Sequence, residues 1–217
     1  MNVEQARFNM IEQQIRPWDV LDTSVLALLS AVRREDFVPE AHRALAFMDI
    51  EIPLPAGQQM LPPRVEARLV QDLNLNKRDS VLVIGAGSGY VTALIAHKAR
   101  RVIALESHPE LVAMARRNLR HAGVNNAEIV EAQGKDGYAG QGPYDAILLT
   151  GSVTDVPQAL MDQVKPGGRL LAIVGREPIM QATLFVKSPE GQVTSEALFD
   201  TLALPLEGMS NPRPFTL

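Results

Sequence analysis

The chain has 217 residues, of which 46% are hydrophobic and 21% are charged, and its formal net charge is −4. This mild acidity argues against a nucleic-acid partner. No apolar run approaches the roughly 20 residues that cross a bilayer, and the N-terminal residues lack the layout of a secretory signal. We therefore expect a cytoplasmic protein without a membrane partner. The absence of cysteine excludes disulfides and zinc–thiolate sites, and the histidines lack metal-ligand spacing, so we expect no metal site.

Residues 1–75 predict helices and a loop. Apolar residues at helical spacing predict a helix from Val3 to Ile15, which Pro17 ends. A second helix is expected over Thr23–Arg34, capped by Asp22 or Thr23, and a short helix follows the turn in REDFVPEAHRAL. The stretch EIPLPAGQQMLPPRVEAR, rich in Pro and Gly, predicts a loop that leads into a helix from about residue 63 to 73.

From residue 80 onward, apolar strands alternate with helices. The strands are expected in VLVIG, RVIALE, AEIVEA, YDAILLTG and RLLAIVG. Only the turn PEGQ separates the last two segments, QATLFVKS and VTSEALFD, so they predict a hairpin. The alternation indicates an α/β fold with a mostly parallel sheet that is covered on both faces. We expect one domain over residues 1–217, with a helical segment at 1–75 and an α/β core at 76–217.

A glycine loop follows the first of these strands. Gly85, Gly87 and Gly89 form GxGxG between a strand and a helix, which allows a tight turn and close backbone approach to a ligand. Glu106 ends the next strand, where a carboxylate can accept both hydroxyls of a ribose. The dinucleotide fingerprint has Gly or Ala five residues after the first glycine, and that position here is Tyr90.

The glycine loop, the acidic strand end and the terminal hairpin resemble the S-adenosylmethionine-dependent methyltransferase fold. That resemblance implies a Rossmann-like class I fold with a seven-stranded, mostly parallel sheet and an antiparallel last strand. The cofactor would be S-adenosyl-L-methionine and the product S-adenosyl-L-homocysteine. Gly85, Gly87, Ser88, Gly89 and Glu106 would bind it; the resemblance adds Asp136 near the adenine amino group and Thr150 at the mouth where donor and acceptor meet.

Over most of its length the chain resembles the protein-L-isoaspartate O-methyltransferase family. The segments that carry this resemblance are RREDFVPEA, AFMDIEIPLPAGQ, VLVIGAGSGYVTALIA, GKDGY, YDAILLTGSVTDVPQALMDQVKPGGRLLAIVG and LALPLEG. The implied reaction is methylation of the α-carboxylate of isoaspartyl residues in damaged proteins, which starts their repair. A carboxylate is ionised at neutral pH, so such an enzyme mainly has to align the reactants.

The loop before the glycine motif departs from the family pattern, in which a Thr and a Ser hydroxyl lie close to the substrate carboxylate. In GQQMLPPR, Gln59 replaces the Thr, Leu61 replaces the Ser, and Arg64 stands where the family usually has His or Tyr. Val83 replaces a Glu that usually precedes the glycine loop. Gln59 and Arg64 are therefore the candidates for positioning the acceptor, since an Arg can grip a carboxylate with two hydrogen bonds.

The altered loop leaves two alternatives open. One is a methyltransferase for a different carboxylate-bearing acceptor. The other is a non-catalytic adaptor or sensor that binds S-adenosylmethionine and recognises modified protein. A nicotinamide-dependent dehydrogenase is disfavoured by the glycine spacing and by the lack of an acid–base pair. The sequence does not indicate an oligomeric state.

Overall fold

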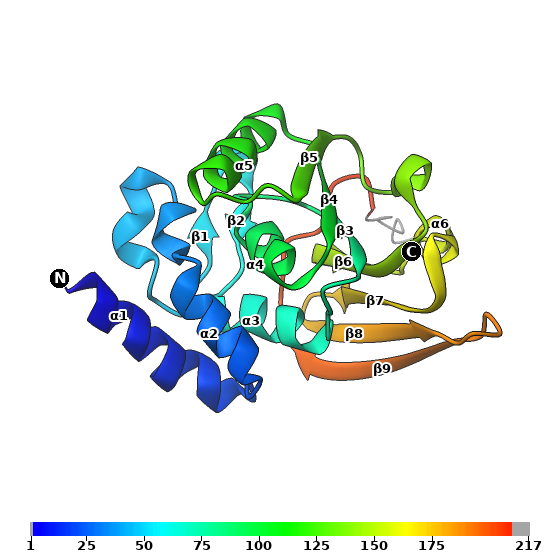
Figure 1. The fold of residues 1–217 in the computed structure, drawn as a ribbon, viewed down its shortest axis with the longest axis horizontal. Helices are drawn as coiled ribbons and strands as arrows, with labels where there is room; N and C mark the ends of the chain where they lie inside the picture. The colour runs from blue at the N-terminus through cyan, green and yellow to red at the C-terminus, as the bar shows by residue number, and fades with distance from the viewer. Residues whose placement is uncertain (1, 210–217) are drawn as a thin grey trace, which may run out of the picture.

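The computed structural model describes residues 2–209, and within them a seven-stranded sheet runs in the order β5-β4-β3-β6-β7-β8-β9 (Figure 1). The strands are β3 (Ser80–Ile84), β4 (Arg101–Glu106), β5 (Ala127–Glu131), β6 (Tyr144–Val153), β7 (Val164–Arg176), β8 (Ile179–Lys187) and β9 (Val193–Asp200). Strands β3 to β7 are parallel, whereas β8 is antiparallel to both β7 and β9. This confirms the predicted mostly parallel sheet that ends in an antiparallel hairpin.

The central strand β3 shows why the sheet is parallel and buried. All five of its residues are buried, and Val83 lies opposite both Ala104 of β4 and Leu148 of β6. Val81 and Val83 pack in one hydrophobic cluster with the helices that precede and follow β3, whereas Leu82 and Ile84 belong to a second cluster on the other face. Alternate residues of an apolar strand therefore serve two cores, as expected for a sheet with both faces covered.

Helices cover the two faces unequally. The larger cluster includes residues of α2 (Thr23–Ala31), α3 (Pro63–Asp72), α4 (Tyr90–Lys98) and α5 (Pro109–His121). The smaller cluster includes Leu160 and Met161 of α6 (Gln158–Asp162), together with Met209. Both crossover helices α4 and α5 lie on one face because the chain moves outward in one direction, from β3 through β4 to β5. None of the helices within residues 2–209 is long and apolar enough to cross a bilayer.

The N-terminal segment is helical, but less regular than predicted. It contains α1 (Val3–Asn9), a π-helix (Met10–Ile15) and short 3₁₀ helices at Arg16–Trp18, Arg34–Asp36, Glu40–Leu45 and Pro55–Gly57, and a further 3₁₀ turn follows later at Ala139–Gln141. The predicted loop also contains two short antiparallel strands, β1 (Ile52–Pro53) and β2 (Gln59–Met60). Strands of two residues are too short to produce a periodic pattern, so the sequence did not predict them.

Helix α2 begins where the sequence predicted and ends three residues early. Asp22 is its N-cap, and its Oδ1 accepts a hydrogen bond from Ser24 N at 2.8 Å. The hydrogen bonds from Ser24 lower the pKa of Asp22, against the opposing effect of burial, and Lys98 lowers it further. The helix ends at Ala31 rather than Arg34 because the Arg34 side chain turns into the interior, where it is fully buried.

We expect Asp22→Ala to reduce the free energy of unfolding by about 1 kcal/mol at neutral pH, because the cap is lost. Asp22→Asn is the matched control and should retain most of that stability. Since the pKa of Asp22 is lowered in the fold, the contribution of its charge is present at neutral pH and is lost as the pH falls through that lowered pKa. Denaturant unfolding at neutral and acid pH tests this, and equal stability of the alanine variant and the unsubstituted chain at neutral pH would contradict it.

Candidate functional site

The site lies where the strand order reverses. From β3 the chain continues to β4 on one side, and β6 is added on the other side, so the carboxyl ends of β3, β4 and β6 surround a switch point. Ligands of open α/β sheets bind at such a point. The glycine loop connects β3 to α4 there, and two cavities of about 40 Å³ each lie beside it, with Gly85 lining both.

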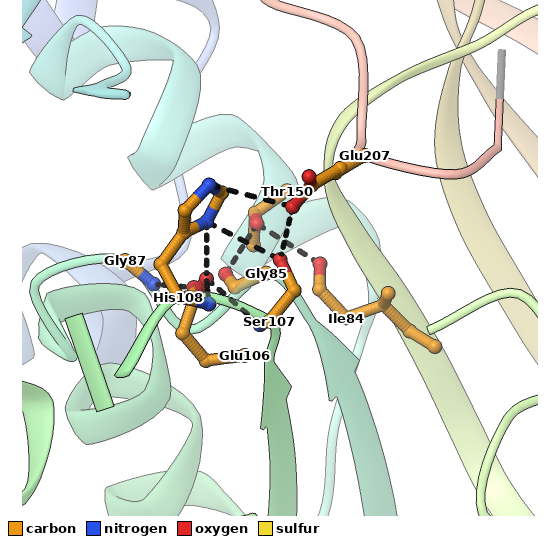
Figure 2. Close-up of polar contacts among 8 residues, drawn as sticks. All are labelled: Ile84, Gly85, Gly87, Glu106, Ser107, His108, Thr150 and Glu207. Carbon is orange, nitrogen blue, oxygen red and sulfur yellow. Dashed lines mark hydrogen bonds and ion pairs between the residues drawn. The ribbon is translucent and has the colours of Figure 1, made fainter. Parts of the chain in front are cut away.

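The first cavity, here called the Glu106 cavity, is built around the end of β4. Glu106 is 6% exposed, and its Oε2 accepts a hydrogen bond from Gly87 N at 2.9 Å. Its Oε1 accepts from Ser107 N at 3.0 Å and from His108 N at 3.1 Å (Figure 2). Three backbone donors therefore fix this carboxylate, and about one of its lone pairs, on Oε2, remains for a hydroxyl donor of a ligand.

The C-terminal segment covers the Glu106 cavity. Leu206 and Glu207 line it, and Glu207 Oε2 accepts a hydrogen bond from Ser107 Oγ at 2.8 Å (Figure 2). Ser152 of β6 fastens the segment: its N–H donates to Leu204 O at 2.8 Å, and its carbonyl accepts from Leu206 N at 2.9 Å. The last described residues are thus part of the cavity wall.

Gly85 has to be glycine for two reasons. Its φ is +90°, which L side chains rarely adopt, and a Cβ there would lie 2.5 Å from Thr150 Oγ1 and 2.9 Å from Leu206 Cδ2. Thr150 Oγ1 lies 2.5 Å from Gly85 O and 3.0 Å from Ile84 O, and so fixes β6 against the glycine loop (Figure 2). At Gly89 a Cβ would lie 3.2 Å from Ala115 Cα, so this glycine allows α4 to approach α5.

The second cavity, here called the Glu66 cavity, lies between the glycine loop and the loop that precedes α3. It is lined by Leu54, Gln59, Met60, Leu61, Glu66, Gly85, Ala86, Gly87, Ser88, Tyr90, Val91 and Thr150. Gln59 reaches it from β2 and is half-buried, whereas Leu61 is 5% exposed and packs into the core. The side chain that replaces the family's serine is therefore apolar and lines this cavity from the core.

A buried arginine holds this loop in place. Arg34 Nε donates to Glu66 Oε2 at 2.9 Å, Nη1 donates to Ala46 O at 2.9 Å, and Nη2 donates to Leu61 O at 2.8 Å. Burial raises the pKa of Glu66, and the positive charge of Arg34 opposes that rise. The ion pair is fully inside the protein, where losing one partner is much more costly than at the surface.

Arg64 faces a third, open cavity of about 740 Å³. It forms an ion pair with Asp49, and its guanidinium carbon lies 4.3 Å from the centre of the Trp18 ring. The other residues that line this cavity are Ile50, Glu51, Pro62, Pro178, Ile179, Met180, Asp200, Thr201 and Leu202. Gln59 and Arg64, both candidates from the sequence, therefore line different cavities.

Most of the residues that the sequence singled out meet at the two small cavities. Among the residues singled out, those that line one or both cavities are Gln59, Gly85, Gly87, Ser88, Glu106 and Thr150. Asp136 does not line either cavity: it is exposed in a turn, and its carbonyl accepts a hydrogen bond from Gln163 Nε2 at 2.8 Å. Within residues 2–209 no group of three His, Cys, Asp or Glu side chains is placed to hold a metal ion.

Sequence reasoning missed Glu66, Leu206 and Glu207 as residues of the site. An acid in the first turn of a helix usually lies at the surface and interacts with the helix dipole, so nothing in PRVEARLV indicates that Glu66 is buried. LALPLEG contributed only to the family resemblance. Its contact with the glycine loop is a long-range one that no local pattern predicts.

We expect Gly85→Ala to destabilise the fold by about 2 kcal/mol or more, since it combines backbone strain with a steric clash. Gly167→Ala is the matched control, because Gly167 also has a positive φ, +78°, but nothing lies within 4 Å of its Cβ position. The midpoints of thermal and denaturant unfolding measure both variants. If Gly85→Ala were no less stable than Gly167→Ala, the close packing of Thr150 and Leu206 on the loop would be refuted.

Comparison with known proteins agrees with this geometry. The family model for protein-L-isoaspartate(D-aspartate) O-methyltransferase matches residues 5–211. Protein-L-isoaspartate O-methyltransferases of Koribacter versatilis and Methanoculleus marisnigri are 35% and 38% identical, over 96% and 94% of this chain and 93% and 92% of theirs.

Two solved structures share the fold. A protein-L-isoaspartate O-methyltransferase has a TM-score of 0.82 at 24% identity and covers 94% of this chain and 67% of its own. A Plasmodium falciparum protein described as an enzyme of the same kind has a TM-score of 0.78 at 20% identity over 95% of this chain and 99% of its own. The family match over nearly the whole chain, together with these relatives, shows that the chain belongs to the protein-L-isoaspartate O-methyltransferase family.

Proposed function

We propose that this protein uses S-adenosyl-L-methionine to methylate the α-carboxylate of L-isoaspartyl residues in damaged proteins. Its relatives are named protein-L-isoaspartate O-methyltransferases, which supports the proposal. The observation that carries the proposal is the Glu106 carboxylate, which three backbone N–H groups hold at the end of β4 beside the glycine loop. A carboxylate in that place suits the two hydroxyls of a ribose.

The residues of the two cavities fit the cofactor. Glu106 would accept hydrogen bonds from the ribose, and the absence of side chains at Gly85 and Gly87 lets the ligand approach the backbone closely. Bound S-adenosyl-L-methionine supplies the methyl group in activated form, on a positively charged sulfur. The related Plasmodium falciparum structure contains S-adenosyl-L-homocysteine, the product that remains after methyl transfer.

The cavities are small for such a ligand. Each holds about 40 Å³, whereas ligand pockets usually hold roughly 300–1,000 Å³. Leu206 and Glu207 cover the Glu106 cavity, and the hydrogen bond between Ser107 and Glu207 joins two exposed side chains. We infer that this segment moves outward when the nucleoside binds and that its contacts then re-form around the ligand.

The chemistry requires little from acid–base groups. The attacking carboxylate is ionised at neutral pH, since α-carboxyl groups titrate at about 3.3–3.7. The chain therefore has to bind both reactants, align them and keep bulk water out. Gln59 and Thr150 both line the Glu66 cavity, which supports the proposal that the side-chain amide of Gln59 donates to the acceptor carboxylate.

Arg64 is proposed to position the polypeptide rather than the reacting carboxylate. It lines the open cavity between the loop before α3 and the β7–β8 turn, and Asp49 and Trp18 already contact its guanidinium. Within the described residues, its buried Nε donates no hydrogen bond. A backbone carbonyl of a bound polypeptide that came within reach could use this donor.

Transfer of labelled methyl groups to an isoaspartyl peptide, with the aspartyl peptide of the same sequence as its control, tests the function. We expect labelling of the isoaspartyl peptide alone and release of S-adenosyl-L-homocysteine in equal amount. Equal labelling of both peptides would favour a different carboxylate acceptor. Binding of S-adenosyl-L-homocysteine without any labelling would favour the adaptor or sensor.

The acceptor loop is tested by Gln59→Ala and Arg64→Ala. We expect Gln59→Ala to lower kcat/KM for the isoaspartyl peptide about tenfold or more, because a hydrogen bond to a charged group is lost. Arg64→Ala should raise KM and leave kcat nearly unchanged, since it acts on binding alone. The Kd of S-adenosyl-L-homocysteine should stay the same in both.

Gln192→Ala, in the exposed β8–β9 turn, is the matched control for the amide and should behave like the unsubstituted chain. Unchanged peptide kinetics in Gln59→Ala would remove that residue from the acceptor site. A loss of S-adenosyl-L-homocysteine binding in Arg64→Ala would place Arg64 with the cofactor instead.

A single domain over residues 1–217 is part of this proposal, with the helical segment at 1–75 and the core at 76–217. One hydrophobic cluster that extends from Met10 to Ala203, and so includes both parts, supports it. The cytoplasmic location, the absence of a nucleic-acid partner and the adenine-binding role of Asp136 stay predictions.

A further inference from the structure

Glu66 is an unusual residue for the wall of a cavity. It is 2% exposed, and among the residues of the described chain that line the Glu66 cavity it is the only carboxylic acid. Strand β3, which leads into the glycine loop, is Ser-Val-Leu-Val-Ile and brings no charge to the site. Among the described residues that line the Glu66 cavity, the only acidic side chain therefore comes from α3.

Half of the Glu66 carboxylate is free for a ligand. Arg34 Nε donates to Oε2, and within residues 2–209 no hydrogen bond reaches Oε1. The hydroxyl of Tyr90, a residue that also lines this cavity, is buried and lacks a hydrogen-bond partner in the same part of the chain. An unsatisfied buried polar group costs about 1–3 kcal/mol, so the Tyr90 hydroxyl, next to a Glu66 carboxylate bonded through Oε2 alone, indicates a polar ligand.

The arrangement of charged groups around the cavity favours a ligand of one charge sign. Arg34 does not line the cavity: its two Nη atoms donate to the carbonyls of Ala46 and Leu61, and its Nε donates to Glu66. An anion that entered would meet the carboxylate first, whereas a cation would meet a free oxygen and a hydroxyl. A primary ammonium group has three N–H donors and suits both acceptors.

The Glu66 and Glu106 cavities share Gly85, and so they form the two ends of one site. The methyl donor has a nucleoside at one end and an amino acid with an α-ammonium group at the other. If Glu106 holds the ribose, the amino-acid end extends past Gly85 towards Glu66.

We propose that Glu66 is a cofactor-binding residue whose carboxylate, held by Arg34, accepts the α-ammonium group of the methyl donor, with the Tyr90 hydroxyl as second acceptor. This inference rests on the proposed function. It assigns to helix α3, and not to the strand before the glycine loop, the negative charge that fixes the amino-acid end of the cofactor. The burial of both partners means that the site is formed before the ligand arrives.

Calorimetric titration with two ligands tests the assignment. S-adenosyl-L-homocysteine contains the α-ammonium group, and 5′-methylthioadenosine lacks the whole amino-acid part. We expect Glu66→Gln to raise the Kd of S-adenosyl-L-homocysteine about tenfold or more. The Kd of 5′-methylthioadenosine should change by less than about twofold. The ratio of the two Kd values is the readout, because general damage to the fold would weaken both ligands alike.

Glu35→Gln is the matched control, since Glu35 forms another buried ion pair, with Arg7, outside both cavities. It should leave the ratio unchanged. Glu66→Asp, which retains the charge, should restore part of the preference for S-adenosyl-L-homocysteine. An unchanged ratio in Glu66→Gln would overturn the inference and leave the proposed function standing.

A ligand-side measurement covers the case in which Glu66→Gln fails to fold. The unsubstituted chain is titrated with an S-adenosyl-L-homocysteine analogue that lacks only the α-amino group, and we expect about tenfold weaker binding. Equal affinity for the two would overturn the inference. If the unsubstituted chain bound 5′-methylthioadenosine and not S-adenosyl-L-homocysteine, the inference would also fall. Binding of neither ligand would overturn the proposed function together with the inference.

Discussion

Arg34 connects three segments that are far apart in the chain. Its guanidinium reaches the carbonyls of Ala46 and Leu61 and the carboxylate of Glu66, and its side chain is fully buried. In the loop between, β1 and β2 pair over only two residues each, and buried apolar residues such as Ile52 and Leu54 pack into the larger hydrophobic cluster. Without the guanidinium, two carbonyls and a carboxylate would be left unpaired in the interior, a cost of several kcal/mol. The position of the loop that precedes α3, and with it the composition of the Glu66 cavity, follows from this one side chain.

The two buried carboxylates of the site are held in place by different means. Glu106 is surrounded by backbone N–H groups at the end of a strand, so its orientation follows from the fold of the sheet. Glu66 depends on a side chain from a distant segment, so its orientation follows from the packing of the N-terminal helices. The two acids line different cavities, and Gly85 of the glycine loop lines both. A methyl transfer that needs no proton shuttle relies on such positioning of its reactants.

Local patterns in the sequence were sufficient to predict a mostly parallel sheet and the glycine loop. The alternation of apolar strands with helices extends over many residues and is therefore easy to recognise. Local patterns were insufficient for β1 and β2, whose two-residue strands have no period. The π-helix at Met10–Ile15 looks like ordinary helix in the sequence, since its apolar spacing differs too little. Burial of Glu66 depends on Arg34, which is distant in the chain, and the separation of Gln59 from Arg64 into different cavities depends on how the loop turns. Long-range contacts of this kind leave no local trace.

The hydrogen bonds between residues 203–207 and β6 affect when the nucleoside pocket is complete during synthesis. Strands β3, β4 and β6 can pair while the end of the chain is still being synthesised. The wall formed by Leu206 closes on Gly85 only after the C-terminal residues have left the ribosome and Ser152 has bound Leu204 and Leu206. A chain in synthesis thus has its sheet before it has its complete nucleoside pocket.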